Sequence, residues 1–459
     1  KSGNTILLTG VSPTITTGGA DLSFSTGNLV LSSAGTTTFT TGSGSAGGIT
    51  VAGTIDGTNG QNEALALESG SGAIQLQGTI GGTNPVTTLA INSTNGSAGT
   101  IEIVGIGDSD TTGASSTATI GNTSTGTLTL DGTIYKTGGN QTYVASATGN
   151  DSGQNIDITG AATFTTTNDA VAFNTSGVDL ANNGTTTINT GTGIGDVSFA
   201  GALESNGGSN DLLVITSGAG DVTFTGAVGA TNALGGLDVN SSAGDGDITF
   251  SSTIGDSGNA GVVGTTAIGG TATEDVNLAG LIYSFDGGTT ITAADGDNIK
   301  LTGTGDVTFT TAADNIEFAT GHIHLADGSN LVVDTGALLG NITIAEIAGT
   351  SVETVTLDAG TGTTSVGPIG SGTEIGDLSI GSDANGGITL NGAIVTDGTV
   401  LIDGPVTLAT GAVSVTTAND TITFNHTING TQTLTLESGS AAIKLDGAIG
   451  GTGILTGLS

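Results

Sequence analysis

The stretch GDVTFTGAVGATNALGGLDVNSSAGDGDITFSSTIG, residues 220–255, contains nearly the same phrase twice. GDVTFTGAV at 220–228 returns as GDITFSSTI at 246–254, and apolar and polar residues alternate in both copies. Alternation with a period of two is typical of a β-strand that buries one of its faces. The repetition raises the question of why one chain restates a glycine, an acidic residue and an apolar pair at a regular interval.

The same phrase recurs along most of the chain. The leading apolar residues of five early copies are separated by 25, 27, 27 and 28 positions; they are Ile49, Ile74, Ile101, Leu128 and Ile156. Those of five later copies are separated by 25, 26, 28 and 31 positions; they are Val197, Val222, Ile248, Val276 and Val307. A second alternating phrase lies between the copies, for example LALES at 65–69 and LVITS at 213–217. Each interval therefore holds at least two short strands, joined by turns rich in Gly, Ser, Asn and Asp.

The length of this interval decides the architecture. A β-sandwich needs turn signals every ~8–12 residues, but no recurring identity at the length of a coil. A propeller blade takes ~40–45 residues and carries aromatic signatures that this chain lacks. In a parallel β-helix each strand stacks on its equivalent in the next coil, so repetition builds a continuous apolar core. We therefore predict an all-β chain that forms one continuous parallel β-helix over residues 1–459, with about 25–28 residues per coil.

Two segments, 163–195 and 314–386, carry weaker copies of the phrase. Their sequences TFTTTNDAVAF and FTTAADNIEF resemble VSVTTANDTITF at 413–424. We interpret the shared core, TT-x-x-(N)D-x-[IV]-x-F, as a second type of coil within the same solenoid. The variable spacing indicates that loops at the corners absorb insertions while the strands stay aligned.

The composition restricts the partners. Formal net charge is −37, from 41 acidic residues against four lysines and no arginine. Phosphate backbones and anionic membranes are bound by Lys and Arg, so we expect no nucleic-acid partner and no attraction to anionic lipid. No apolar run approaches the ~18 residues of a membrane span, so no membrane insertion is expected. The chain has no cysteine, which agrees with an oxidising, extracellular surface, and no methionine, so we expect a processed chain or part of a longer one.

Catalysis is not expected. Enzymes with this fold that act on polysaccharides need converging acids and usually an Arg or Lys, and here the acids lie mostly in turns. Those turns are candidates for Ca²⁺ binding through carboxylate and carbonyl oxygens, and solvated corner residues are the alternative. The candidate ligands are Asp108, Asp110, Asp245, Asp247, Asp295 and Asp297. No other cofactor is expected, and the HIH triplet at 322–324 is a metal pair or, as the simpler alternative, a surface pair.

The two ends of the sequence suggest a partner. Residues 433–452 nearly repeat residues 64–83, and the start KSGNTILLTGV has the pattern of the phrase that follows such a strand. Neither end has the pattern of a polar cap, which natural solenoids use to cover their unpaired backbone groups. We therefore expect head-to-tail stacking of the chain with copies of itself, and a trimmed segment is the alternative. A head-to-tail contact that does not close into a ring gives an open fibre.

The recurring phrases GDVTFTGAV and LDVNSSAG resemble those of bacterial secreted surface proteins of the filamentous-haemagglutinin type and of autotransporter passengers. The resemblance implies an extracellular right-handed β-helix that serves in adhesion, aggregation or fibre formation. The sequence therefore favours a non-enzymatic, extracellular subunit of a fibre, sheath or filament. The alternative is a cell-surface adhesin segment that binds glycans or a host surface through loops, chiefly in 163–195 or 314–386.

Overall fold

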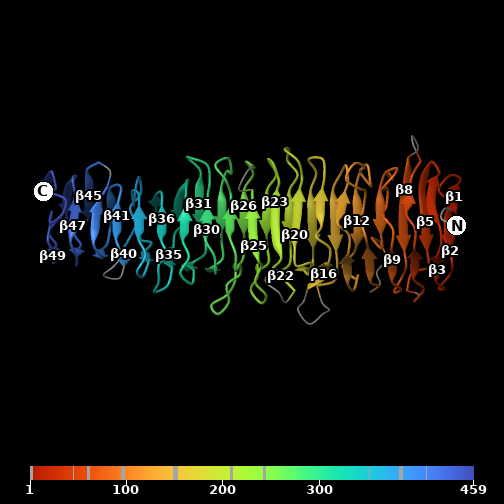
Figure 1. Ribbon diagram of the computed structural model, residues 1–459, viewed down its shortest axis with the longest axis horizontal. Coiled ribbons are helices and arrows are strands. Elements are labelled where there is room, and N and C mark those ends of the chain that lie inside the picture. Colours follow the sequence, from red (N-terminus) through yellow and green to blue (C-terminus); the bar gives the residue numbers. More distant parts are fainter. Residues whose placement is uncertain are drawn as a thin grey trace. The chain divides into compact units, whose positions relative to one another are not determined.

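The computed structural model describes residues 4–459 except residues 45, 59–61, 95–98, 148–153, 207–209, 241–243, 351, 382–385 and 410. In the described residues the chain is all-β without a helix, and its parallel sheets stack as a β-solenoid of about 18 turns with about 24 residues per turn. The predicted fold class is thereby confirmed. Strands of successive turns lie side by side (Figure 1).

The chain divides into two compact units, Lys1–Ala227 with Ala243–Gly246 and Val228–Ser242 with Asp247–Ser459. The expectation of one continuous solenoid over 1–459 stays a prediction. The first unit contributes four groups of parallel strands. They are β1 (Thr5–Thr9), β4 (Asn28–Ser32) and β7 (Ile55–Asp56); β2 (Thr14–Thr16), β5 (Gly35–Thr40), β8 (Glu63–Glu68), β10 (Leu89–Ile91), β12 (Ala118–Gly121), β15 (Gln141–Val144), β18 (Val171–Asn174), β21 (Val197–Phe199) and β24 (Val222–Phe224); β3 (Leu22–Phe24), β6 (Ile49–Val51), β9 (Ile74–Leu76), β11 (Ile101–Ile103), β13 (Leu128–Leu130), β16 (Gln154–Ile158), β19 (Gly177–Leu180) and β22 (Leu203–Ser205); and β14 (Ile134–Lys136), β17 (Thr163–Thr165), β20 (Thr185–Asn189) and β23 (Leu212–Thr216).

The second unit is built in the same way. Its strands are β25 (Gly236–Val239), β27 (Thr266–Ile268), β30 (Thr289–Ile291), β33 (Ile316–Phe318), β36 (Ile342–Ile344), β39 (Thr364–Val366), β41 (Ile388–Leu390), β44 (Val406–Leu408) and β47 (Ile428–Gly430); β26 (Ile248–Phe250), β28 (Val276–Leu278), β31 (Asn298–Leu301), β34 (His322–Leu325) and β37 (Ile347–Ala348); β29 (Ile282–Ser284), β32 (Gly305–Thr310), β35 (Ser329–Asp334), β38 (Val355–Asp358), β40 (Leu378–Gly381), β43 (Val400–Asp403), β46 (Ile422–Phe424) and β49 (Ile443–Leu445); and β42 (Ile394–Thr396), β45 (Val413–Thr417), β48 (Thr433–Glu437) and β50 (Gly457–Leu458).

The repeated phrase forms ladders of equivalent residues. In β21 and β24 the pairing is parallel and in register, with Val197 beside Val222 and Phe199 beside Phe224. The rings of Phe199 and Phe224 stack at 5.1 Å with 3° between their planes, and Phe173 stacks on Phe199 at 5.0 Å. All three rings are at most 1% exposed. The restated apolar pair thus supplies each coil with the partner that buries it, because one coil alone cannot enclose a core.

The second type of coil is explained by a turn. In each of its three copies a threonine at the end of one strand donates its hydroxyl hydrogen to the carbonyl of the aspartate three residues later. The pairs are Thr166 with Asp169, Thr311 with Asp314 at 2.7 Å, and Thr417 with Asp420 at 2.6 Å. The threonine is nearly buried in all three. The motif therefore encodes a corner, where the hydroxyl satisfies a carbonyl that no strand can pair.

Part of the chain is built twice. In the first unit Ile80, Ile106 and Tyr135 pair in three successive coils, and in the second unit Val228, Ile254 and Tyr283 do the same, each 148 positions later (228 − 80, 254 − 106, 283 − 135). A neighbouring column repeats at the same offset. It consists of Val86, Ala114 and Thr137 in the first unit and Leu234, Val262 and Phe285 in the second.

Candidate functional site

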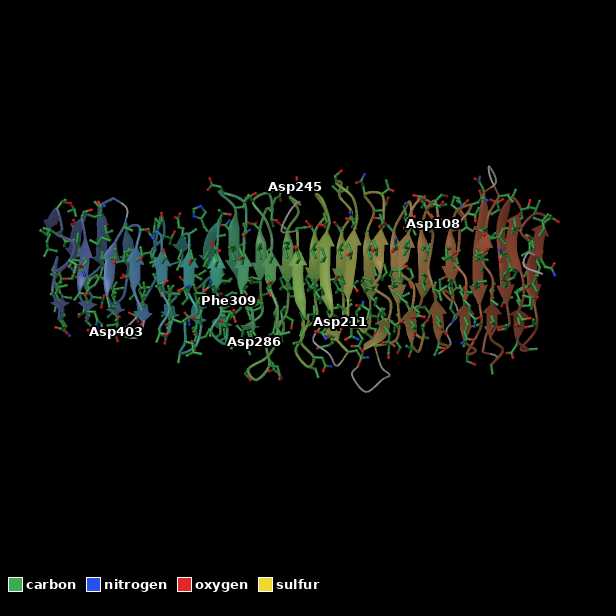
Figure 2. All side chains as sticks on the ribbon, viewed as in Figure 1. Asp108, Asp211, Asp245, Asp286, Phe309 and Asp403 are labelled. Carbon is green, nitrogen blue, oxygen red and sulfur yellow. The ribbon has the colours of Figure 1, made fainter. Side chains whose placement is uncertain are left out.

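The six aspartates proposed as Ca²⁺ ligands lie in corners. Asp108 Oδ1 accepts the backbone N–H of Asp110 at 2.8 Å and of Thr111 at 2.6 Å, and these bonds hold the pKa of Asp108 below its usual range. Asp247 Oδ1 accepts the backbone N–H of Asp275 at 3.0 Å. The structure keeps each pair, Asp108 with Asp110, Asp245 with Asp247 and Asp295 with Asp297, in its own turn, and Asp108 and Asp245 are far apart along the first unit (Figure 2). Over the described part of the chain, no three His, Cys, Asp or Glu side chains group so that they could hold a metal ion.

Many corner acids and amides instead hold the next coil. Asp196 Oδ1 accepts the backbone N–H of Asp221 at 3.0 Å, and Asp377 Oδ1 accepts that of Thr399 at 2.6 Å. Asn341 Oδ1 does the same for Thr363 at 2.8 Å. Such bonds satisfy corner N–H groups that the sheets leave unpaired. The negative charge of the corners therefore has a structural use.

Buried carboxylates are also satisfied by the backbone. Asp211 is 1% exposed, and its Oδ1 accepts the N–H of Asn182 at 3.0 Å and of Asn183 at 2.6 Å. Its Oδ2 accepts the hydroxyl of Ser205 at 2.5 Å. Asp211 lies at a corner of the first unit (Figure 2). A buried acid that accepts three hydrogen bonds is suited to fixing a turn.

Two of the three histidines, His322 and His426, pair with carboxylates. His322 and His324 lie on one face of β34, and His322 Nδ1 is 3.0 Å from Glu346 Oε2. His324 lies beside Lys300 in the register of β31 and β34, and His426 Nε2 is 3.3 Å from Asp403 Oδ1. Because an ammonium group next to His324 disfavours a second cation, the geometry supports the surface-pair alternative over a metal pair.

The outermost coils leave core positions open. Ile422 in β46 is 0% exposed, whereas its partner Ile443 in β49 is 41% exposed. Strand β49 is the last member of its sheet, and Ile454 and Leu458 are 81% and 50% exposed. The apolar pattern that stacking covers elsewhere is thus accessible at this coil face.

The duplicated segments each carry a protruding loop. We name residues 108–112 the first hood and residues 256–260 the second hood. Asp108 N–H bonds the carbonyl of Thr111 at 2.9 Å, and Asp256 N–H bonds that of Asn259 at 3.0 Å. Asp256 Oδ1 accepts the N–H groups of Gly258 and Asn259, as Asp108 Oδ1 does in the first hood. The two hoods therefore have the same backbone hydrogen bonds.

The strand beneath each hood is also held in the same way. Gly113 N–H bonds the carbonyl of Lys136 at 2.9 Å, and Gly261 N–H bonds that of Ser284 at 2.7 Å. Both hoods begin after a glycine in the left-handed region, Gly107 with φ 75° and Gly255 with φ 72°. A side chain other than that of glycine is strained at such a φ, so the glycine fixes where each hood starts.

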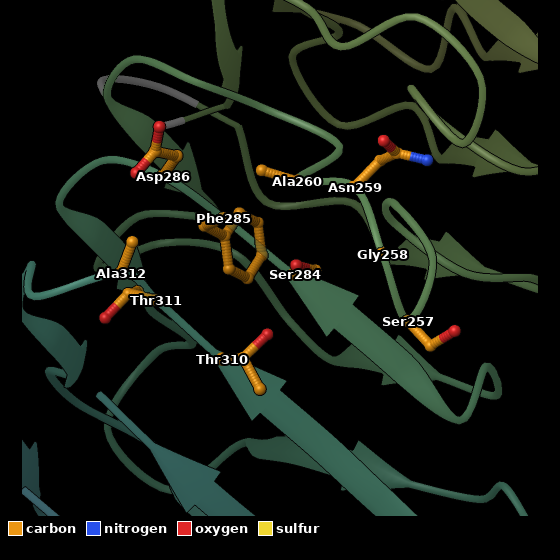
Figure 3. A pocket seen from close by; sticks show the side chains of 10 residues that line it. All are labelled: Ser257, Gly258, Asn259, Ala260, Ser284, Phe285, Asp286, Thr310, Thr311 and Ala312. Carbon is orange, nitrogen blue, oxygen red and sulfur yellow. The ribbon is translucent and has the colours of Figure 1, made fainter. Parts of the chain in front are cut away.

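The space beneath the hoods differs. Under the first hood Lys136 Nζ donates a hydrogen bond to the carbonyl of Ser109 at 3.0 Å. The residue equivalent to Lys136 in the second copy is Ser284. A pocket of about 330 Å³ lies there, and Figure 3 shows it between the second hood and two neighbouring strand ends. Its polar lining includes Ser257, Asn259, Ser284, Asp286, Thr310 and Thr311.

The pocket lies outside the segments for which the sequence predicts surface binding. Those segments are 163–195 and 314–386, whereas the residues that line the pocket fall within 257–312. The signal that was available is the tetrapeptide IGDS, which occurs at 106–109 and again at 254–257. Comparing the two copies residue by residue reveals the exchange of Lys136 for Ser284.

No family model, curated protein or solved structure matches this chain. The resemblance to filamentous-haemagglutinin-type and autotransporter proteins therefore stays a prediction. Among the residues that the structure describes, no helix is long and apolar enough to cross a membrane.

Proposed function

We propose that this chain is a non-enzymatic, extracellular structural protein that forms a fibre by end-to-end stacking of its solenoid coils. The observation that carries the proposal is that coils of this chain cover one another in register through a repeated apolar phrase. Ile422 in β46 is fully buried and pairs with Ile443 in β49, which presents the same phrase again. Covering such a face with another coil removes apolar side chains from water and pairs the free edge of β49.

A second copy of the chain is the occupant that we propose. Residues 433–452 nearly repeat residues 64–83, whose strands β8 and β9 are covered in this structure by β10 and β11 of the next coil. IKL in β49 corresponds to IQL in β9, which Ile101–Ile103 covers in register. The exposed face thus carries a pattern that coils of this same chain cover elsewhere. The absence of cysteine supports an extracellular location.

Concentration series followed by sedimentation and negative-stain electron microscopy test the proposal. We expect filaments that lengthen with protein concentration and with salt, because salt screens the repulsion between copies of charge −37. Single particles at every concentration and salt would contradict assembly. Repeating the series with EDTA separates backbone stacking from the Ca²⁺ hypothesis, since stacking alone is insensitive to the chelator.

A segment that binds a surface ligand is the second candidate. The pocket beneath the second hood favours it, because concave sites with several convergent polar groups are where ligands bind. Glycans remain one proposed ligand of such a segment. The chemistry of this pocket indicates a more specific one, which is argued next.

A further inference from the structure

We propose that the pocket beneath the second hood binds a primary ammonium group, supplied by an amine ligand or by a lysine side chain. The proposal is independent of fibre assembly, because none of the lining residues lies at the open coil face. It rests on a comparison within the chain, where the first hood shows the same place filled by an ammonium group.

The first hood demonstrates the interaction. Lys136 Nζ lies 3.0 Å from the carbonyl oxygen of Ser109, and its positive charge also helps to lower the pKa of Asp108. A hood with this backbone conformation therefore presents a carbonyl acceptor to an ammonium group, and the carboxylate of Asp108 interacts with that group through its charge. An ammonium group has three hydrogens to donate, so further acceptors can bind it.

The second hood retains the carbonyl acceptor of the serine and lacks the lysine. Its hydrogen bonds place Ser257 where the first hood has Ser109, and Asp256 where it has Asp108. Ser284 replaces Lys136, so the side chain that fills the space in the first copy is reduced to a hydroxymethyl group. Ser284 lines the pocket of about 330 Å³ beneath the second hood.

The second copy places its carboxylates differently, because Gly258 replaces Asp110 and Asp286 replaces Gly138. Asp286 occupies the position of Gly138, lines the pocket, and accepts no side-chain hydrogen bond from the described residues. Ser284, Thr310 and Thr311 add hydroxyl groups to the lining. The described lining of the pocket therefore holds the carboxylate of Asp286 and no cation, so a ligand with one positive charge and several donor hydrogens matches it.

The matched variants follow from the same comparison. Ser284→Lys should fill the pocket with the chain's own ammonium group, as Lys136 does in the first copy. Lys136→Ser should open an equivalent pocket beneath the first hood. Asp286→Asn removes a pocket charge, and Asp327→Asn is the control, since Asp327 is exposed and lies outside the pocket.

Saturation-transfer NMR on the full chain at low salt measures the binding. The probes are 1-aminobutane and Nα-acetyl-lysine methylamide, each with its neutral N-acetylated form as the control. We expect the wild type to give signals for the charged probes. In Ser284→Lys and Asp286→Asn these signals should fall about threefold or more, which is the size of effect that an exposed charge pair gives. Asp327→Asn should leave them unchanged, and Lys136→Ser should raise them by clearly less than twofold, because the second pocket that it opens has Gly138 in the place of Asp286. If both probes bind, a simple amine suffices; if only the lysine derivative binds, a polypeptide lysine is the source.

Three results would overturn the proposal. The first is an equal signal from the wild type and from Ser284→Lys. The second is an equal signal from the charged probes and their acetylated forms. The third is no amine signal together with Ca²⁺-induced shifts of protein resonances from the pocket, which would assign the site to a divalent cation. Circular dichroism of each variant verifies that the solenoid is retained, and the gain expected for Lys136→Ser cannot arise from unfolding.

Discussion

Lys136 and Ser284 lie 148 residues apart at equivalent places beneath two hoods with the same backbone hydrogen bonds. The lysine reaches the carbonyl of Ser109, whereas the serine leaves a pocket of about 330 Å³. The two corners therefore differ in their side chains while their backbone hydrogen bonds are the same. In a repeat protein the frame is set by stacking, so single positions on its surface can change at little cost to the fold.

The aromatic ladder should dominate local stability. We expect Phe199→Ala to lower the free energy of unfolding by about 3–5 kcal/mol, because it opens a cavity between the stacked rings of Phe173 and Phe224. The neighbouring Ser198 points outward and is half-buried. Ser198→Ala should therefore change the free energy of unfolding by less than about 0.5 kcal/mol. Urea denaturation of both variants measures the difference. Equal urea midpoints for the two variants would contradict a dominant role of the aromatic ladder in local stability.

Glycine is required where two coils approach closely. A Cβ atom on Gly81 would lie 2.0 Å from the carbonyl oxygen of Gly113, and Gly81 has a φ of +67°. Gly81→Ala should therefore destabilise the chain by at least about 1–3 kcal/mol. A Cβ on Gly288 meets no atom within 4 Å, so Gly288→Ala should be neutral or stabilise by up to about 1 kcal/mol. Thermal unfolding of the two variants tests this contrast. Equal unfolding temperatures for Gly81→Ala and Gly288→Ala would contradict the prediction.

Acid should weaken the corner at Glu353. Burial raises the pKa of this carboxyl group, but hydrogen bonds from the Thr350 hydroxyl and backbone outweigh burial, so the pKa lies below its ordinary value of 4.5. A lowered pKa in the folded state stabilises the fold above pH 4.5, and this contribution is lost as the pH falls through the folded pKa. Glu353→Gln should therefore cost about 1–3 kcal/mol at pH 7 and progressively less below pH 4.5. Unfolding midpoints of both proteins across this pH range provide the measurement, and a gap that is independent of pH would refute the assignment.

Assembly should depend on the open coil face and not on exposed apolar residues in general. Ile443 is 41% exposed at this face in the ladder position of the buried Ile422, and Ile194 is 77% exposed on a corner loop of the first unit. Ile443→Asp places a charge where the next coil must stack, so we expect it to abolish filaments. Ile194→Asp is the matched control and should assemble like the wild type. Sedimentation of both variants distinguishes them, and equal inhibition would point to nonspecific aggregation.

Most of the fold could be predicted because the repeated phrase is itself the physical cause of stacking. Val197 and Val222 share a ladder position, and the spacing of the two residues gives the coil length directly. The corner motif around Thr311 and Asp314 was recognised as a pattern, but its hydroxyl-to-carbonyl bond required the structure.

The pocket could not be predicted in the same way. It depends on a side chain that the second copy lacks, and on a hood whose conformation follows from glycine φ values and backbone bonds rather than from residue type. The acidic residues were recognised as corner residues, yet their bonds to the next coil, such as Asp196 to Asp221, depend on the register between coils. Sequence periodicity specifies the ladders, whereas side-chain use at corners depends on three-dimensional contacts.

Cryo-electron microscopy of the assembled protein tests the central claim most directly. The account predicts that a strand of the next copy lies parallel to β49 at a spacing of about 4.8 Å, so that Ile443 becomes as buried as Ile422 and the ladder continues across the junction. Filaments joined through their sides, with the edge of β49 facing solvent, would contradict it.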